Sequence, residues 1–137
     1  MGGKHVIVLD THTWIWFINS PEELGKRAVV AIDKARSTGE GLHISCISTW
    51  EIHMLAAKNR LTLAIAPDLW VSRCERLSFI RFHPVNNSIA RLAVTACAAM
   101  HADPADRMIV ATALYLGASV VTRDEKIKAS ALVPCIW

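Results

Sequence analysis

Four acidic residues, Asp10, Glu51, Asp106 and Asp124, stand where a strand is expected to end or a helix to begin. Carboxylates that share one small site repel one another, and their pKa values rise unless a cation lies between them. Mg²⁺ and Mn²⁺ prefer such hard oxygen ligands and keep several bound waters. Two ions of this kind, about 4 Å apart, activate water and stabilise the leaving oxygen when a phosphodiester is hydrolysed. Metal-assisted phosphodiester hydrolysis is therefore the chemistry that these residues would support if they meet.

The stretch 101–113 offers a purely structural explanation for acids of this kind. Asp103 can cap a helix whose first residue is Pro104, and Asp106 falls three residues after that cap. Acidic side chains favour helix N-termini through capping and through the helix macrodipole. The apolar residues that follow recur at helical spacing: Ala105, Met108, Ile109, Thr112, Ala113 and Leu116. Capping alone would explain these acids unless other carboxylates converge on them.

Short apolar runs alternate with helical patterns along the chain. Strands are expected at residues 5–9, 42–45, 78–82 and 118–121, with a short edge strand at 133–136. Helices are expected at 11–19, from 22 or 24 to 36, and at 48–60, 67–77, 86–101 and 103–117, and a last one opens at 122–125. Ser48 and Glu51 would form the capping box of the 48–60 helix. The alternation predicts a three-layer α/β/α sandwich around a central parallel sheet of four to five strands, in a single domain spanning 1–137.

The expected parallel sheet brings the four acids together. Ligands bind beyond the carboxyl ends of the strands in such sheets. Asp10 and Asp124 follow two strands, whereas Glu51 and Asp106 begin helices, and helices antiparallel to the strands start at the same edge. Acids separated by 41, 55 and 18 positions therefore reach one rim. Capping also leaves Asp10 unexplained, because Thr11 directly after it is the better cap.

Composition is consistent with a folded protein that meets a polyanion. The chain has 137 residues, of which 53% are hydrophobic and 20% charged, and this balance argues against disorder. The net charge is +3, and setting the four acids aside leaves 15 basic against 8 acidic residues, or +7. A basic surface around an acidic pocket suits a polyanion that approaches metal ions. No apolar run is long enough to span a membrane, and the first residues lack a signal peptide or a myristoylation motif, so we expect a cytoplasmic protein.

Cysteine and histidine spacing gives no sign of a zinc site or a disulfide framework. Cys46, Cys74, Cys97 and Cys135 form no C-x-x-C pair and have apolar neighbours, which favours buried free thiols. The six histidines lack the spacing of metal ligands.

Four segments also match a known family in order and span nearly the whole chain. They are residues 9–12 (LDTH), 45–52 (SCISTWEI), 101–113 (HADPADRMIVATA) and 121–124 (VTRD). With these segments the chain resembles the PIN-domain nucleases, particularly the toxin subunits of VapBC-type toxin–antitoxin pairs. Each segment is weak evidence alone, whereas the four together are fairly specific. The resemblance implies cleavage of single-stranded or structured RNA, pairing as a homodimer, and inhibition by an antitoxin that covers the site.

The resemblance also implies roles for individual residues. Asp10 and Asp106 would be the principal Mg²⁺ ligands, and Glu51 and Asp124 would complete the site directly or through water. Thr122 stands where the family has a hydroxyl residue before its last acid, and would orient a ligand or a substrate phosphate.

Several other residues near the acids have either a functional or a structural interpretation. Thr11 and Asp103 are expected to orient ligands or substrate, although Asp103 is also the expected helix cap. His12 is close enough to Asp10 to touch RNA, but an uninvolved histidine at a helix start is the favoured interpretation. Arg107 and Arg123 flank acids and would either meet phosphates or pair with carboxylates.

The tryptophans are interpreted first as anchors of a core or an interface. Trp14, Trp16, Trp50 and Trp70 have this role more often than that of a platform for stacked bases. Trp14 and Trp16 cannot face the same side of one helix, so one of them marks a surface for a partner.

Three functions remain to be distinguished. The first is a Mg²⁺- or Mn²⁺-dependent endoribonuclease in which water is the nucleophile, restrained by an antitoxin. The second is a non-catalytic module that binds RNA or protein, in which the acids only cap helices. The third is a phosphotransfer domain built on Asp10, which is disfavoured because His12 stands where enzymes of the haloacid-dehalogenase type have a second acid.

Overall fold

The computed structural model describes residues 5–137, so the first four residues of the expected 1–137 unit lie outside the described residues. One parallel sheet of five strands forms the centre, in the order β3-β2-β1-β4-β5. The strands are β1 (Ile7–Leu9), β2 (Leu42–Ser45), β3 (Ile80–His83), β4 (Ser119–Val121) and β5 (Cys135–Ile136). The helices are α1 (Thr11–Asn19), the 3₁₀ turn η1 (Pro21–Glu23), α2 (Lys26–Ser37), α3 (Cys46–Ala57), α4 (Pro67–Glu75), α5 (Asn87–Thr95), α6 (Pro104–Leu116) and α7 (Glu125–Ser130).

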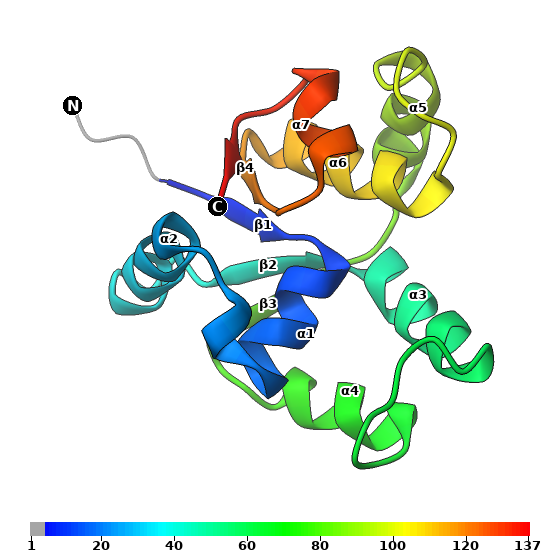
Figure 1. Ribbon diagram of the computed structural model, residues 1–137. Coiled ribbons are helices and arrows are strands. Elements are labelled where there is room, and N and C mark those ends of the chain that lie inside the picture. The colour runs from blue at the N-terminus through cyan, green and yellow to red at the C-terminus, as the bar shows by residue number, and fades with distance from the viewer. Residues whose placement is uncertain (1–4) are drawn as a thin grey trace.

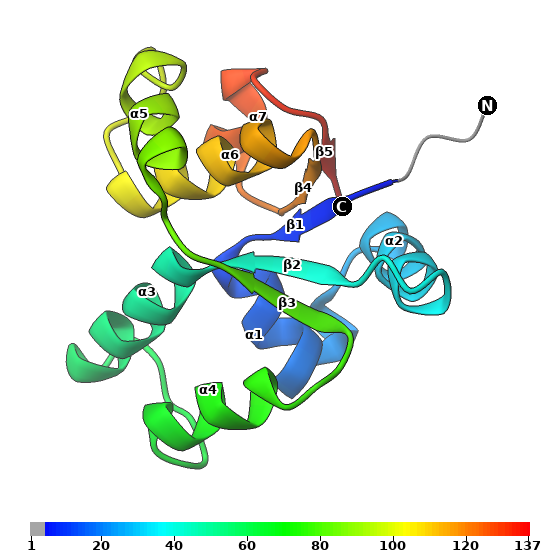
Figure 2. The ribbon, with the colours of Figure 1, turned by 180° about the vertical axis from the view of Figure 1, so that it is seen from behind.

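Helices cover both faces of this sheet, which confirms the predicted α/β/α sandwich. Figure 1 shows α5, α6 and α7 on one side of the strands and α1, α2 and α4 on the other. The opposite view in Figure 2 shows β3 at one edge and β5 at the other. Helix α3 contacts α6 as well as α1 and α4, so it joins the two helical layers.

Alternating side chains of the strands supply two separate cores. Leu9 and Ile44 belong to the core beneath α1, α2 and α4, whereas Val8 and Val120 belong to the core beneath α5, α6 and α7. A strand that is covered on both faces needs apolar residues at every position. The uniformly apolar sequence of β1 follows from this double burial.

The order of the strands creates a crevice between β1 and β4. The chain passes from β1 to β2 and β3 on one side, then returns to place β4 and β5 on the other. The helices that follow β1 and β4 leave toward opposite faces, and open parallel sheets bind ligands at such a switch point. Asp10 and Thr122 are the first residues beyond these two strands.

Helix α3 begins earlier than expected. Its N-cap is Ser45, whose hydroxyl accepts the N–H of Ile47, so the capping box predicted at Ser48 and Glu51 is wrong. Strand β2 runs directly into the helix without a loop, and the end of the strand therefore decides the cap. Ser48 and Glu51 lie inside the helix, one turn apart on the same face.

The helix expected at 86–101 is also shorter than predicted, because α5 ends at Thr95. The segment that follows turns back so that α6 can pack against α5. Two of its carbonyl groups accept hydrogen bonds from a side chain of α6: the Arg107 guanidinium donates to the carbonyl oxygens of Met100 at 2.7 Å and His101 at 3.0 Å. Helix α6 ends as expected, at Gly117, which adopts the left-handed conformation with a φ of 65°.

Two further expectations from composition concern membrane spans and cysteines. None of the helices formed by residues 5–137 has the length and apolar character needed to cross a membrane. All four cysteines lie in this range and are free thiols, with Cys74 and Cys97 buried and Cys46 and Cys135 half-buried.

Trp14 is the largest fully buried side chain and packs against Trp70 and Phe82 at centroid distances of 5.0 and 5.3 Å. We expect Trp14→Ala to lower the free energy of unfolding by about 3–5 kcal/mol, through lost burial and the cavity left behind. The matched control is Trp50→Ala, because Trp50 is 53% exposed, and its expected effect is within about 0.5 kcal/mol. Urea denaturation measures both values, and equal losses would contradict the assignment of Trp14 to the core.

Candidate functional site

A pocket of about 310 Å³ lies at the carboxyl edge of the sheet. Its lining residues are Asp10, Thr11, His12, Trp16, Glu51, Asp103, Asp106, Arg123 and Asp124. The four acids that the sheet topology was expected to bring together therefore share one pocket, with Asp103 beside them. Thr122 is buried behind the lining.

Asp10 is held in place by hydrogen bonds from both sides of the crevice. Its Oδ1 accepts the N–H of Thr13 at 2.8 Å, which makes Asp10 the N-cap of α1. The expectation that Thr11 would be the better cap is wrong, because the extended backbone of a cap falls on the residue that ends β1. The Thr122 hydroxyl donates to Oδ2 of Asp10 and accepts the N–H of Asp124. One hydroxyl thus links the acids that follow β1 and β4.

Glu51 reaches the pocket because α3 is tied to the start of α1. The Thr11 hydroxyl donates to Oγ of Ser48 at 2.8 Å, and both residues are buried. Glu51 lies one turn after Ser48 on the same helix face. The Thr11–Ser48 contact therefore sets the position of Glu51 relative to Asp10.

Asp106 and Asp103 stand at the start of α6, as expected. Asp103 caps the helix by accepting the N–H of Asp106 on its Oδ1 at 3.0 Å. Asp106 itself is not a cap, and its Oδ2 lies 2.6 Å from Nε2 of His101. Among the described residues, Nδ1 of His101 is buried without a hydrogen-bond partner. No role is predicted for His101 from the sequence, because the residue is expected at the end of a helix that in fact stops at Thr95.

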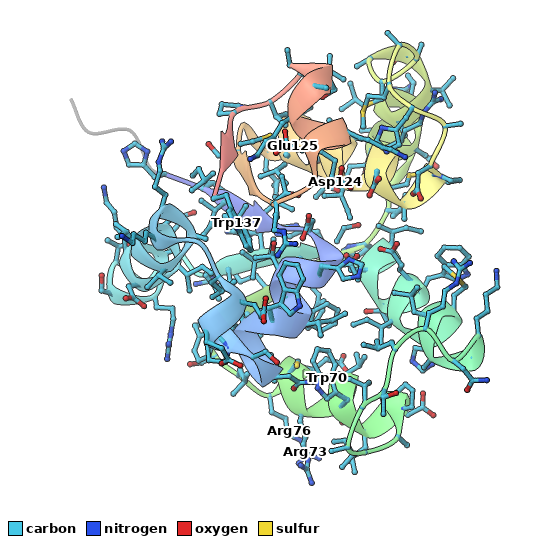
Figure 3. All side chains as sticks on the ribbon, in the orientation of Figure 1. Trp70, Arg73, Arg76, Asp124, Glu125 and Trp137 are labelled. Atoms are coloured by element: carbon cyan, nitrogen blue, oxygen red, sulfur yellow. The ribbon has the colours of Figure 1, made fainter. Side chains whose placement is uncertain are left out.

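Asp124 caps α7 by accepting the N–H of Lys126 at 2.8 Å. The label in Figure 3 marks Asp124 where the chain leaves the sheet toward α7. The caps of α1, α6 and α7 are thus three acids of the pocket, and the positive ends of these helix dipoles face it.

Burial raises the pKa of Asp10 and of Glu51. For Asp10, hydrogen bonds from Thr122 and from the Thr13 N–H oppose this rise. For Glu51, the nearby Thr11 hydroxyl opposes the effect of burial, whereas the negative charge of Asp103 adds to it. Both carboxylates are therefore harder to ionise than in water, despite their donors.

The pKa of Asp106 is raised as well. Burial raises its pKa to about 6, the hydrogen bond from His101 opposes the rise, and the charges of Asp103 and Asp124 add to it. The acids of the pocket therefore interact, and a cation between them would favour their ionised forms.

The donor set suits a hydrated Mg²⁺ or Mn²⁺ ion. The pocket acids supply hard carboxylate oxygens, and Asp10 and Glu51 influence one another electrostatically, as do Asp106 and Asp124. Within residues 5–137, no three His, Cys, Asp or Glu side chains are arranged to hold a metal by themselves. Mg²⁺ is usually bound through one or two carboxylates and several waters, so the pocket fits such an ion better than it fits zinc.

The basic residues near the acids divide into two groups. Arg107 does not line the pocket, since its guanidinium binds main-chain carbonyl oxygens. Arg123 and His12 do line it.

The tryptophans occupy two kinds of environment, the core and the surface. Trp14 and Trp70 are core residues, as interpreted first. Trp50 is exposed on α3, and Trp16 lines the pocket.

The model of the family described as "PIN domain" matches residues 7–131, which include every acid of the pocket. The chain belongs to the PIN-domain family. Among curated PIN relatives, it is similar to "Ribonuclease VapC22" of Mycobacterium tuberculosis, with 32% identity over 122 residues, 89% of each chain.

Solved structures support the PIN fold. A DNA-bound VapBC from Salmonella typhimurium is similar with a TM-score of 0.67 at 20% identity, covering 96% of this chain and 97% of that one. FitAcB from Neisseria gonorrhoeae is similar with a TM-score of 0.60 at 23% identity, covering 95% and 96%.

The raised pKa of Asp106 gives the metal-free protein a defined pH dependence. The folded state binds a proton more tightly than the unfolded state between the ordinary carboxyl pKa and about 6, so stability falls as pH rises through this window. In EDTA, we expect Asp106→Asn to remove up to about 3 kcal/mol of this fall.

Urea denaturation between pH 4 and 7.5 measures the effect. The variant should gain stability over the unaltered chain at pH 7.5, with the difference shrinking toward pH 4. Glu125→Gln is the control, because the Glu125 side chain is 86% exposed beside the pocket acid Asp124. A difference between Asp106→Asn and the unaltered chain that does not vary with pH would contradict the prediction.

Proposed function

We propose that this PIN-domain chain is a divalent-metal-dependent endoribonuclease and the toxin of a toxin–antitoxin pair. The observation that supports it best is the pocket in which the buried Asp10 and the half-buried Glu51 and Asp106 have raised pKa values beside Asp124. Capping accounts for Asp10 and Asp124 but not for Glu51 or Asp106, which cap nothing. Holding these two acids ionised costs stability, and a divalent cation offsets that cost.

We assign the binding of Mg²⁺ or Mn²⁺ to Asp10, Glu51, Asp106 and Asp124. A bound cation would compensate phosphate charge and make water more acidic. Thr122 fixes the orientation of Asp10 and Asp124, and Thr11 fixes α3 so that Glu51 faces them. Asp103 holds the start of α6, and His101 holds one oxygen of Asp106, which leaves its other oxygen to face the pocket.

RNA is the proposed substrate because of the positive net charge of the chain and its similarity to a named ribonuclease. The relative from Mycobacterium tuberculosis is named a ribonuclease, and the net charge of +3 on a chain with an acidic pocket leaves the remaining surface basic. The solved VapBC complex supports the proposal of an antitoxin partner. We further propose that the toxin is a cytoplasmic homodimer.

Removing one pocket charge should stop the chemistry without unfolding the chain. We expect Asp10→Asn or Asp106→Asn to lower the rate of RNA cleavage at least about a hundredfold, since each removes charge that orients and binds the cation. A labelled RNA incubated with Mg²⁺ or Mn²⁺ and resolved on a gel measures cleavage, and Glu125→Gln should retain the full rate. Cleavage by Asp106→Asn at the unaltered rate would refute the assignment.

Binding of the cation should be visible without any substrate. At a tenfold excess over its Kd, an ion bound only by the folded state contributes about 1.4 kcal/mol to stability. We therefore expect Mn²⁺ to raise the Tm of the unaltered chain but not of a variant in which both Asp10 and Asp106 are Asn. No shift at millimolar Mn²⁺ would favour the alternative, a non-catalytic module that binds RNA or protein.

The toxin role is tested separately from the chemistry. We expect induced expression of the unaltered chain to arrest growth of a bacterial host, and expression of Asp10→Asn at equal level to leave growth normal. Co-expression of the protein encoded beside this chain should restore growth. Normal growth together with active RNA cleavage in vitro would leave a nuclease that is not a toxin.

A further inference from the structure

Trp16 presents a half-buried indole to the acidic pocket, while Trp14 on the other side of α1 is buried in the core. The guanidinium of Arg123 lies over the Trp16 ring, with Cζ 5.4 Å from its centroid. The ring of His12 lies 5.7 Å from the same indole, tilted by 51°. A wall of planar groups therefore stands beside the carboxylates.

This wall is held in place from behind by Trp137. The two indoles meet edge to face, with centroids 5.7 Å apart. The Trp137 carbonyl oxygen accepts the N–H groups of Arg27 and Ala28 at the start of α2, and a Cβ on Gly25 would come within 2.7 Å of Trp137. Figure 3 labels Trp137 between the end of β5 and the α1–α2 region. Because the Trp16 indole is already packed, binding a ligand orders few additional groups.

The positive charge of Arg123 is not paired with a carboxylate among the described residues. Among residues 5–137 it forms no ion pair, although Asp124 is its neighbour in the chain and in the pocket. Its contact is the Trp16 ring. A guanidinium in this state can stack on a flat ring and can also meet a phosphate.

We propose that Trp16 and Arg123 bind the unpaired base next to the phosphate that is cleaved, an inference that rests on the proposed ribonuclease function. Aromatic side chains stack on any base, because every base has a π face. A base inside a duplex is stacked on its neighbours and cannot reach the wall, whereas a base in a loop or a single strand can. The wall therefore selects unpaired nucleotides at the acidic pocket, with little preference for sequence.

Binding of RNA, measured without cleavage, tests the wall. Fluorescence anisotropy measures the affinity for a labelled, unstructured RNA of about ten nucleotides. Every protein tested carries Asp10→Asn, the background substitution that prevents cleavage. Adding Trp16→Ala or Trp16→Leu should weaken binding at least about fivefold, whereas Trp16→Phe should stay within about twofold. Trp16→Leu keeps an apolar side chain against Trp137 and lacks the aromatic face. Trp50→Ala is the matched control and should bind like the background, because Trp50 is exposed outside the pocket.

Abasic substitutions distinguish stacking from a general loss of structure. Removing the base at one position of the RNA should weaken binding to the background protein, and this penalty should vanish when Trp16 is Leu but persist when Trp50 is Ala. Arg123→Gln, at an exposed residue, is a second variant that leaves the core intact and should also reduce the penalty. An undiminished penalty with Trp16→Leu, or unchanged affinity, overturns the proposal.

The cleavage assay separates this inference from the proposed function. If the unaltered chain binds single-stranded RNA through Trp16 but cleaves none with Mg²⁺ or Mn²⁺, the nuclease proposal fails and the binding wall remains. If it cleaves RNA while Trp16→Leu leaves both KM and affinity unchanged, only the wall fails. If the unaltered chain neither cleaves RNA nor binds it, and the background protein does not bind it either, both proposals are overturned.

Discussion

The burial of one carboxylate at the end of β1 constrains the rest of the site. Asp10 is 7% exposed, and its oxygens accept hydrogen bonds from the Thr13 N–H and the Thr122 hydroxyl. A buried carboxylate is tolerated only with such donors. One donor comes from α1 and the other from the segment beyond β4, and the Thr13 hydroxyl also donates to the Val121 carbonyl oxygen at 2.8 Å. The two strands that flank the crevice are therefore held together by the same bonds that position its first acid.

Helix capping and metal binding are compatible roles for these acids. A carboxylate that accepts one helix N–H keeps further lone pairs for a ligand. Asp10, Asp103 and Asp124 cap three helices whose positive dipole ends point at the pocket, and this field moderates the repulsion among the acids. Glu51 and Asp106 cap nothing and are half-buried with raised pKa values. Capping does not explain why these two carboxylates are partly removed from water, and sites of this kind commonly lower stability in exchange for function.

The sequence determined much of the fold in advance, because strands covered on both faces favour apolar residues. The run at β1 is uniformly apolar, and β2 and β4 are short segments in which apolar residues accompany His43, Ser45 and Ser119. The sequence was less informative where elements meet. Ser48 carries the local signature of a cap, yet the direct passage from β2 into α3 places the cap at Ser45. The alanine-rich stretch after Asn86 favours a long helix locally, yet packing of α5 on α6 and the carbonyl contacts of Arg107 end it at Thr95.

The sequence alone determined the parallel α/β fold and which acids reach the carboxyl edge of its sheet. Local patterns of apolar and polar residues predict which segments are buried strands and where each strand ends. The tertiary structure alone decided the partners of those acids: His101 on Asp106, the Thr122 hydroxyl between Asp10 and Asp124, and the Arg123 guanidinium over Trp16. Most of these contacts join residues far apart in the chain or beyond misjudged helix ends. They depend on how whole elements pack, and no local pattern encodes that geometry.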